Sequence, residues 1–362
     1  MASPSFDIDR RTFLEEYWQR KPLLLKAALP HWHSPLEPEE LAGLAMEEID
    51  SRLVAQDEGG WSVANGPFRA KDFNRSGRWT LLVNGVDQWV PEVAALRGCL
   101  DFLPQWRFDD VMVSYATDGG SVGPHFDRYD VFLLQGLGKR CWRIGEFCDG
   151  ATPCIDHEGL RLLEEFEAVS EYLLEPGDAL YLPPGIAHWG IAEGECMTYS
   201  LGFRAPRLVD LLARMTDDLL EKLDPEALLE DQNSIFKPPR PGELTADHLS
   251  NARNAVLNAL VALDDGAALG ALVSEAGEAG PPLAAGGSRV KCYPGARLCW
   301  QRVAGGLRVF ANGEQLEVSD VCQPALEALC SDQSVTRVEL DQADPELATF
   351  LNLQGVLIEA DD

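Results

Sequence analysis

Several features are scarce or missing in this sequence of 362 residues, and each absence excludes a class of protein. No CxxC pair occurs among the nine cysteines, which are odd in number and irregularly spaced, so neither a disulfide framework nor a zinc ribbon is expected. No apolar run approaches the roughly 20 residues that cross a bilayer. The first residues, MASPSFDIDRRTFLEEYW, are polar and acidic, unlike a secretory signal. These absences favour a soluble protein of a reducing cytoplasm, without a membrane partner.

Positive charge is also scarce. Lys and Arg total 30 against 59 Asp and Glu, which gives a net charge of −29. Surfaces that bind phosphate need the opposite sign, so direct nucleic-acid binding is not expected. A strongly acidic protein attracts basic partners and steers their approach. Solubility alone explains the same charge equally well.

The pattern along the chain divides it into three segments. Residues 1–205 open with two short helical runs and continue, from Trp61, with short β-rich runs separated by turn residues, which predicts a barrel or sandwich. Residues 206–280 repeat leucines at helical spacing, which predicts amphipathic helices whose apolar faces need the barrel or a second copy of the chain to cover them. A linker is expected at 279–287, AGPPLAAGG.

The tail, residues 288–362, shows a hairpin pattern followed by helical runs around PALEALC and PELATFLNL. This mixture suits a small α+β module of the winged-helix type. Winged helices often bind DNA, but the tail holds six Lys or Arg against twelve Asp or Glu, a net charge of −6. We therefore expect no direct DNA binding at physiological salt.

Two separated runs carry the residues of a candidate metal site. His125 and Asp127 in GPHFDRYDVFLL stand at i and i+2, so on a strand both point to one face while Phe126 points away. His188 follows 61 residues after Asp127, at the end of the run PGDALYLPPGIAH. Two histidines and one carboxylate form the facial triad of non-haem iron(II) oxygenases, whereas a zinc site more often recruits Cys or a third His.

The alternative for HxD alone is a surface pair beside a turn, because so short a pattern often arises by chance. The run PGDxxYxPPxxxH around His188 is the more specific signal. The other histidines, His31, His33, His157 and His248, lie among polar or charged residues, and we expect them to be structural or exposed.

An arginine within the β-rich segment suggests a cosubstrate. In KRCWRIG, which follows a predicted turn at Gly136–Gly138, alternation places Arg140 on the same face as Trp142 and Ile144, toward the core. A buried guanidinium needs an anionic partner, and a dicarboxylate cosubstrate supplies one through two parallel hydrogen bonds. The alternative is an internal salt bridge to an Asp or Glu. Ser114, in DDVMVSYAT, is a further candidate donor to the same carboxylate.

These residues resemble the JmjC-type oxygenases on a cupin barrel (a double-stranded β-helix), and most closely the bacterial ribosomal oxygenases that hydroxylate an arginine of a large-subunit ribosomal protein, the sixteenth. The resemblance covers nearly the whole chain. It rests on EELAGLAM with DSRLV (39–54), GPHFDRYDVFLLQGLGKRCWRIGE (123–146), LEPGDALYLPPGIAHWG (174–190) and YSLGFRAP (199–206), and on ANGEQLE and QPALEAL, which are similar to the family's winged-helix module.

The resemblance implies an enzyme, a 2-oxoglutarate-dependent dioxygenase of the ribosomal protein arginine 3-hydroxylase type. It implies that His125, Asp127 and His188 form the catalytic iron(II) site and that Arg140 and Ser114 contact 2-oxoglutarate. It also implies that residues 206–280 form a homodimer. One departure is Ala116, which stands where a serine is expected. Because ribosomal proteins are basic, we expect carboxylates to line the mouth of the barrel.

Two other functions stay open from the residues alone. The first is a cupin-type metal dioxygenase or isomerase that acts on a small molecule without 2-oxoglutarate. The second is a non-catalytic scaffold that retains a barrel, although the complete triad and Arg140 argue against it.

Overall fold

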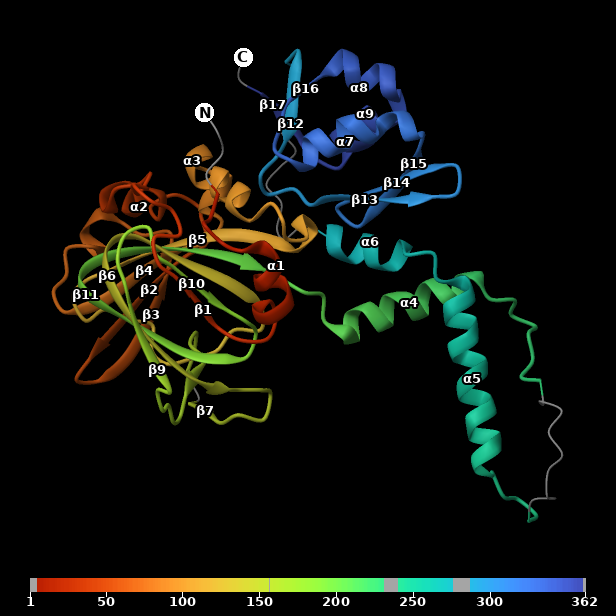
Figure 1. Cartoon of the computed structure of the whole chain (residues 1–362), viewed down its shortest axis with the longest axis horizontal. Helices are drawn as coiled ribbons and strands as arrows, with labels where there is room; N and C mark the ends of the chain where they lie inside the picture. Colours follow the sequence, from red (N-terminus) through yellow and green to blue (C-terminus); the bar gives the residue numbers. More distant parts are fainter. Residues whose placement is uncertain (1–4, 156, 231–239, 276–286, 361–362) are drawn as a thin grey trace. The chain divides into compact units, whose positions relative to one another are not determined.

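The structure of the chain, a computed structural model, describes residues 5–155, 157–230, 240–275 and 287–360 (Figure 1). It divides into two compact units, Met1–Ala205 and Pro206–Asp362. Most of the linker predicted at 279–287 lies outside the described residues.

Short helices accompany the first unit. The helix α1 (Arg10–Thr12) continues as a π-helical turn over Phe13–Tyr17, and α2 (Pro38–Leu44) begins at a proline, which suits the first helical turn. Both predicted helical runs are therefore confirmed. The sequence did not predict α3 (Pro91–Ala94). Single 3-10 turns occupy Ala70–Asp72, Val86–Gln88, Ala95–Leu100 and Gln105–Arg107.

Within the described part of this unit, nine antiparallel strands form the main sheet, in the order β1-β10-β6-β11-β5-β4-β2-β3, with β9 also paired to β6. The strands are β1 (Leu23–Leu25), β2 (Ser51–Asp57), β3 (Gly60–Asn65), β4 (Arg78–Val83), β5 (Phe108–Ala116), β6 (Asp130–Phe147), β9 (Ser170–Leu174), β10 (Ala179–Leu182) and β11 (Ile186–Phe203). The short pair β7 (Cys154–Ile155) and β8 (Leu162–Leu163) stands apart from them. The predicted barrel is confirmed (Figure 1).

The turn predicted at Gly136–Gly138 is wrong, because β6 runs through it without interruption. The neighbouring strand β11 shifts register between Glu193 and Met197, so both strands bend here instead of ending. Gly138 has a φ of +61°, and a Cβ at this position would collide with the backbone of Glu195. The glycines therefore allow two bent strands to approach closely.

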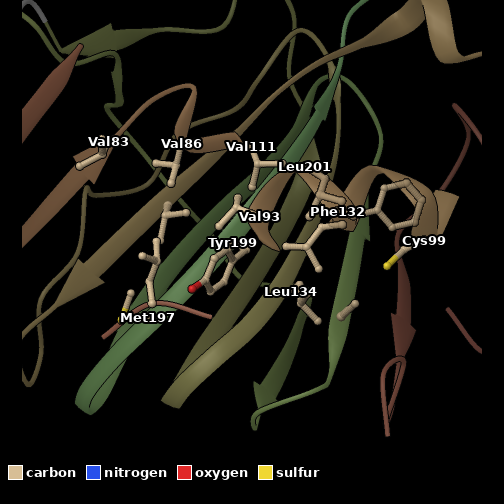
Figure 2. Packing of buried hydrophobic residues seen from close by; sticks show 14 of the residues in the cluster. Val83, Val86, Val93, Cys99, Val111, Phe132, Leu134, Met197, Tyr199 and Leu201 are labelled. Carbon is tan, nitrogen blue, oxygen red and sulfur yellow. The ribbon is translucent and has the colours of Figure 1, made fainter. Parts of the chain in front are cut away.

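Alternation along the strands separates a packed face from a hollow one. Phe132 and Leu134 on β6 join Tyr199 and Leu201 on β11 in the hydrophobic core, as Figure 2 shows. The alternate residues of these strands and of β5 line an internal cavity instead: Met112, Ser114, Val131, Leu133, Thr198 and Ser200. The period of two thus builds the core and the walls of the cavity from the same strands.

The second unit begins with helices α4 (Leu208–Lys222), α5 (Ala246–Leu263) and α6 (Ala267–Ser274). The first two were predicted from their apolar spacing, and α6 was not. It packs against the sheet that follows, where Gly270 leaves room for the ring of Phe310. Among the described residues no single helix is long and apolar enough to cross a membrane, although α5 and α6 meet that criterion together as a pair bent by 71°.

The tail contains two small three-stranded sheets and short helices. Its elements are β12 (Arg289–Cys292), β13 (Leu298–Val303), β14 (Gly306–Ala311), β15 (Glu314–Val318), α7 (Gln323–Cys330), β16 (Val335–Thr336), α8 (Arg337–Ala343), α9 (Pro345–Leu353) and β17 (Leu357–Glu359). The hairpin β13–β14 and the helices α7 and α9 confirm the prediction. The sequence reading missed α8, although the capping box of Thr336 and Glu339 is a sequence signal for the start of a helix.

Candidate active site

The backbone brings the two predicted metal-binding runs together. His125 and Asp127 do not lie on a regular strand, so that part of the prediction is wrong: His125 forms a single β-bridge with His188 in the segment between β5 and β6. Pro124 has no N–H to extend a ladder, and Gly123 has a φ of +82°, which interrupts it. The His125 N–H donates to the His188 carbonyl at 3.0 Å, and the reverse bond measures 2.8 Å.

The side chains of residues 125–127 nevertheless alternate in direction, as they would on a strand. Phe126 packs with Cys148, Leu163 and Ala187 in a small separate core, while its two neighbours face the cavity. Asp127 Oδ2 lies 3.6 Å from His188 Nε2, and one potential ligand atom from each of the three side chains lies within 4.8 Å of the others. Among the described residues, this is the one cluster of His, Cys and acidic groups with such geometry.

Both imidazoles are oriented for metal binding. Nδ1 of His125 is 2.9 Å from the Gly123 carbonyl, and Nδ1 of His188 is 2.9 Å from the Ile186 carbonyl. A protonated Nδ1 donates to each carbonyl, which leaves the Nε2 lone pair free for a metal. Burial, reinforced by the neighbouring His125, lowers the pKa of His188 to about 4, so its imidazole is neutral at physiological pH. Two imidazoles and one carboxylate are the donor set that suits iron(II).

The remaining described histidines stand elsewhere. Nε2 of His157 lies 2.9 Å from the Trp61 carbonyl, and Nδ1 of His248 accepts a hydrogen bond from the Thr245 N–H. His31 and His33 are exposed. None of the four belongs to the cluster, as expected.

The triad opens into a cavity of about 370 Å³ inside the barrel. Its walls come from β2, β4, β5, β6 and β11, and they are mainly apolar. The aliphatic and aromatic lining residues are Val54, Leu82, Met112, Val122, Phe126, Tyr129, Val131, Leu133, Trp142, Leu160 and Leu162. A small-molecule site of this kind keeps few polar groups, and those few fix the ligand's orientation.

Arg140 is buried in the same cavity, with 3% of its surface exposed. Its Nη1 donates to Ser114 Oγ at 3.1 Å and to Thr198 Oγ1 at 3.3 Å. Burial lowers the pKa of the guanidinium, and no carboxylate among the described residues pairs with it. The internal salt bridge that the sequence left open is therefore not found in the part of the chain that the structure describes.

Three buried polar atoms on the cavity wall lack a hydrogen-bond partner in the structure. They belong to Arg140 (Nε), Trp142 (Nε1) and Thr80 (Oγ1). A buried donor without a partner costs about 1–3 kcal/mol. A ligand carboxylate beside Arg140 supplies acceptors for these groups and an anion for the guanidinium. The residues present therefore fit a dicarboxylate such as 2-oxoglutarate.

The sequence reading missed Thr198, which lies opposite Ser114 in the β5–β11 register. The signal was present in MTYSLGF, where Thr198 and Ser200 alternate with larger apolar residues. Small polar residues at every second position of an otherwise apolar strand indicate a wall that faces a ligand.

The expectation that carboxylates line the mouth of the barrel stays a prediction, but the walls of the cavity inside it are poor in them. Asp127 is the one acidic residue there, and three arginines besides Arg140 line the cavity: Arg52, Arg128 and Arg161. Net charge reports how many acidic groups a chain carries and not where the fold places them.

Comparison with known proteins follows the same division of the chain. Residues 95–211 match the JmjC domain family, and residues 282–360 match the ROXA-like winged helix. The chain is 46% identical over 211 residues to the ribosomal protein uL16 3-hydroxylase of Escherichia coli (strain K12), a match that covers 58% of this chain and 56% of that protein. It is 37% identical over 256 residues to a probable ribosomal oxygenase of Haemophilus influenzae, covering 68% of this chain and 63% of that protein. Each match thus spans less than two thirds of the curated relative.

Solved structures extend the likeness over both units. The X-ray structure of E. coli YcfD matches with a TM-score of 0.80 and 33% identity, covering 99% of this chain and 100% of that chain. The E. coli ribosomal oxygenase YcfD in complex with cobalt and 2-oxoglutarate matches with a TM-score of 0.78 and 33% identity, covering 98% and 99%. The barrel with this triad, together with the match of residues 95–211, defines the first unit as a JmjC domain of the cupin class. Within that class, the chain belongs to the ribosomal oxygenases.

Proposed function

We propose that the chain is an iron(II)- and 2-oxoglutarate-dependent protein hydroxylase that acts on an arginine side chain of the large-subunit ribosomal protein uL16. The observation that carries the proposal is the pairing, in one cavity, of the His-Asp-His cluster with a buried arginine that has no carboxylate partner. The uL16 3-hydroxylase of E. coli supports the choice of substrate.

The protein's own residues perform three tasks in this reaction. His125, Asp127 and His188 hold the metal from one side and leave its remaining positions toward the cavity. Arg140 and Ser114 bind the far carboxylate of the cosubstrate, and Thr198 supports the same guanidinium. The apolar walls exclude water. When bound, iron and 2-oxoglutarate supply the oxidising chemistry, in which dioxygen gives one oxygen atom to a C–H bond and the cosubstrate loses CO₂ and becomes succinate.

The direct test is incubation of the purified chain with recombinant uL16, iron(II) and 2-oxoglutarate in air. We expect mass spectrometry to find one added oxygen atom on one arginine of uL16, with one succinate formed for each hydroxylation. Binding of 2-oxoglutarate without any modified arginine would contradict the proposed substrate. If neither binding nor turnover of 2-oxoglutarate occurs, a different metal-dependent reaction or a scaffold role replaces the proposal.

We also propose that the helical segment 206–280 forms a homodimer. Its helices leave large apolar side chains uncovered within their own unit: Leu208, Val209, Leu212 and Leu220 on α4, and Leu249, Val256, Leu257 and Val261 on α5. An apolar surface of this size on a water-soluble chain supports a partner that covers it.

The test of this dimer is the double substitution Leu212→Asp with Val256→Asp. We expect wild-type protein to sediment as a dimer and the double variant as a monomer, because a carboxylate in an apolar interface is costly to desolvate. Leu353→Asp, at an equally exposed leucine on α9, is the matched control and should remain dimeric. A monomeric wild type, or a double variant that stays dimeric, would refute the proposal.

Location and other partners belong to the same proposal. A ribosomal protein substrate suits a cytoplasmic enzyme, and no disulfide joins the cysteines among the described residues, which supports a reducing compartment. The acidic tail supports a winged helix that does not bind DNA.

A further inference from the structure

The charge inside the cavity is opposite to the charge of the protein around it. Four arginines line it, Arg52, Arg128, Arg140 and Arg161, against one acidic residue, Asp127. Residues 1–205 as a whole hold 18 Lys and Arg against 33 Asp and Glu, a net charge of −15. The single acidic lining residue is a proposed metal ligand, so the other charged residues of this mainly apolar lining are arginines.

Three of these arginines have, within the described residues, no carboxylate partner of the kind that other cations in the same unit have. Arg143 pairs with Glu171 at 2.9 Å, and Arg204 pairs with Asp109 at 2.5 Å. No carboxylate among the described residues lies within ion-pair distance of Arg52, Arg128 or Arg161. In a unit with nearly twice as many acids as bases, three guanidinium groups that line one cavity without a carboxylate partner in the described part of the chain favour an anion from outside.

The three arginines reach the cavity from different parts of the first unit. Arg52 is half-buried on β2, while Arg128 and Arg161 are exposed and come from the segments around β6 and β8. The guanidinium of Arg161 lies over the ring of Phe126, with its carbon 5.0 Å from the ring centre. Phe126 also lines the cavity, so this cation–π contact holds the positive charge of Arg161 at the cavity wall.

An anionic cosubstrate meets an obstacle in this protein. A dicarboxylate carries two negative charges and approaches a unit of charge −15, which repels it at long range. Cationic groups that line a low-dielectric cavity reverse the repulsive field close to the cavity. They raise the rate at which an anion associates with it. The target of the proposed reaction is an arginine, whose own positive charge gains nothing from three further guanidinium groups.

We propose that Arg52, Arg128 and Arg161 form a cationic collar that draws dianionic 2-oxoglutarate through the acidic field of the protein toward Arg140. The inference rests on the proposed function, since it assumes that this cavity takes 2-oxoglutarate. The collar sets the rate of association, and Arg140 sets how long the bound molecule stays.

The experiment measures association and dissociation rates directly and does not depend on turnover. Iron(II)-loaded protein is mixed with 2-oxoglutarate under anaerobic conditions in a stopped-flow instrument, and binding is followed by charge-transfer absorbance and tryptophan fluorescence. The proteins compared are wild type, the three single variants Arg52→Gln, Arg128→Gln and Arg161→Gln, and the triple variant. Arg78→Gln is the matched control, because Arg78 is exposed on β4, does not line the cavity and loses the same charge.

We expect the triple variant to bind 2-oxoglutarate about tenfold more slowly than wild type at low ionic strength, with an unchanged dissociation rate. Wild-type association should slow as salt rises, because the Debye length falls from about 30 Å at 0.01 M to about 3 Å at 1 M. The triple variant should lose that dependence or reverse it. Arg78→Gln should behave as wild type.

Three results would overturn the collar. The first is equal association rates for wild type, Arg78→Gln and the triple variant. The second is a change confined to the dissociation rate, which would make the arginines contact residues. The third is a loss of uL16 binding with unchanged 2-oxoglutarate kinetics, which would assign the collar to the protein substrate. Absence of any 2-oxoglutarate binding by wild type would instead defeat the proposed function itself.

Discussion

Replacing Asp127 with alanine is expected to reduce 2-oxoglutarate turnover by more than about a hundredfold. Outer-shell partners of a metal site are worth about 10–100-fold in affinity or activity, and a direct ligand should exceed that range. His125→Ala should behave in the same way. Both variants should also bind iron(II) more weakly than wild type, which equilibrium dialysis followed by metal analysis measures without any turnover.

The fold should survive these substitutions. Asp127 is partly exposed, and its carboxylate approaches His188, which is neutral at physiological pH, at 3.6 Å. Its removal therefore leaves no buried charge without a partner. Thermal unfolding of the metal-free variants should match wild type, and His33→Ala, at an exposed histidine outside the cavity, should keep full activity. Substantial decarboxylation of 2-oxoglutarate by Asp127→Ala would refute the assignment of the triad.

The candidate metal cluster was predictable because its geometry depends on short-range features. His125 and Asp127 are two residues apart, and extended backbone alone places their side chains on one face. The proline-rich turn before His188 returns the chain beside them. Regular strand structure at 125–127 was wrong because Gly123 and Pro124 limit pairing to a single bridge, yet the backbone is still extended enough to keep the orientation.

Features that depend on a partner strand were not predictable. The glycines at 136 and 138 are typical of a turn, and only the bend of the adjacent strand β11 shows that β6 continues through them. Thr198 enters the site because it lies in register with Ser114, a relation between residues 84 positions apart. The place of charged side chains in the structure also depends on contacts between distant parts of the chain. The acidic composition gave no sign that the fold gathers Arg52, Arg128 and Arg161 on the walls of one cavity.

Arg140→Ala is expected to raise the KM for 2-oxoglutarate by about ten- to a hundredfold while kcat at saturating cosubstrate changes little. Hydrogen bonds to charged groups contribute about 1.5–3 kcal/mol, and each 1.4 kcal/mol is a factor of about ten in affinity. The side chain of Arg140 donates to two hydroxyl groups and pairs with no carboxylate among the described residues. Its truncation therefore leaves no described carboxylate without a partner. The stability of the cofactor-free protein should therefore fall little.

Two further variants locate the effect on Arg140 itself. Arg140→Lys keeps the charge but loses the planar fork that binds a carboxylate through two bonds, so its KM should lie between those of wild type and Arg140→Ala. Arg143→Ala is the matched control, because it lies on the same strand, faces outward and pairs with Glu171; its KM should equal that of wild type. In the binding experiment, Arg140→Ala should accelerate dissociation and leave association nearly unchanged, the opposite of the collar variants. An unchanged KM with a lower kcat for uL16 would show that Arg140 serves the protein substrate instead.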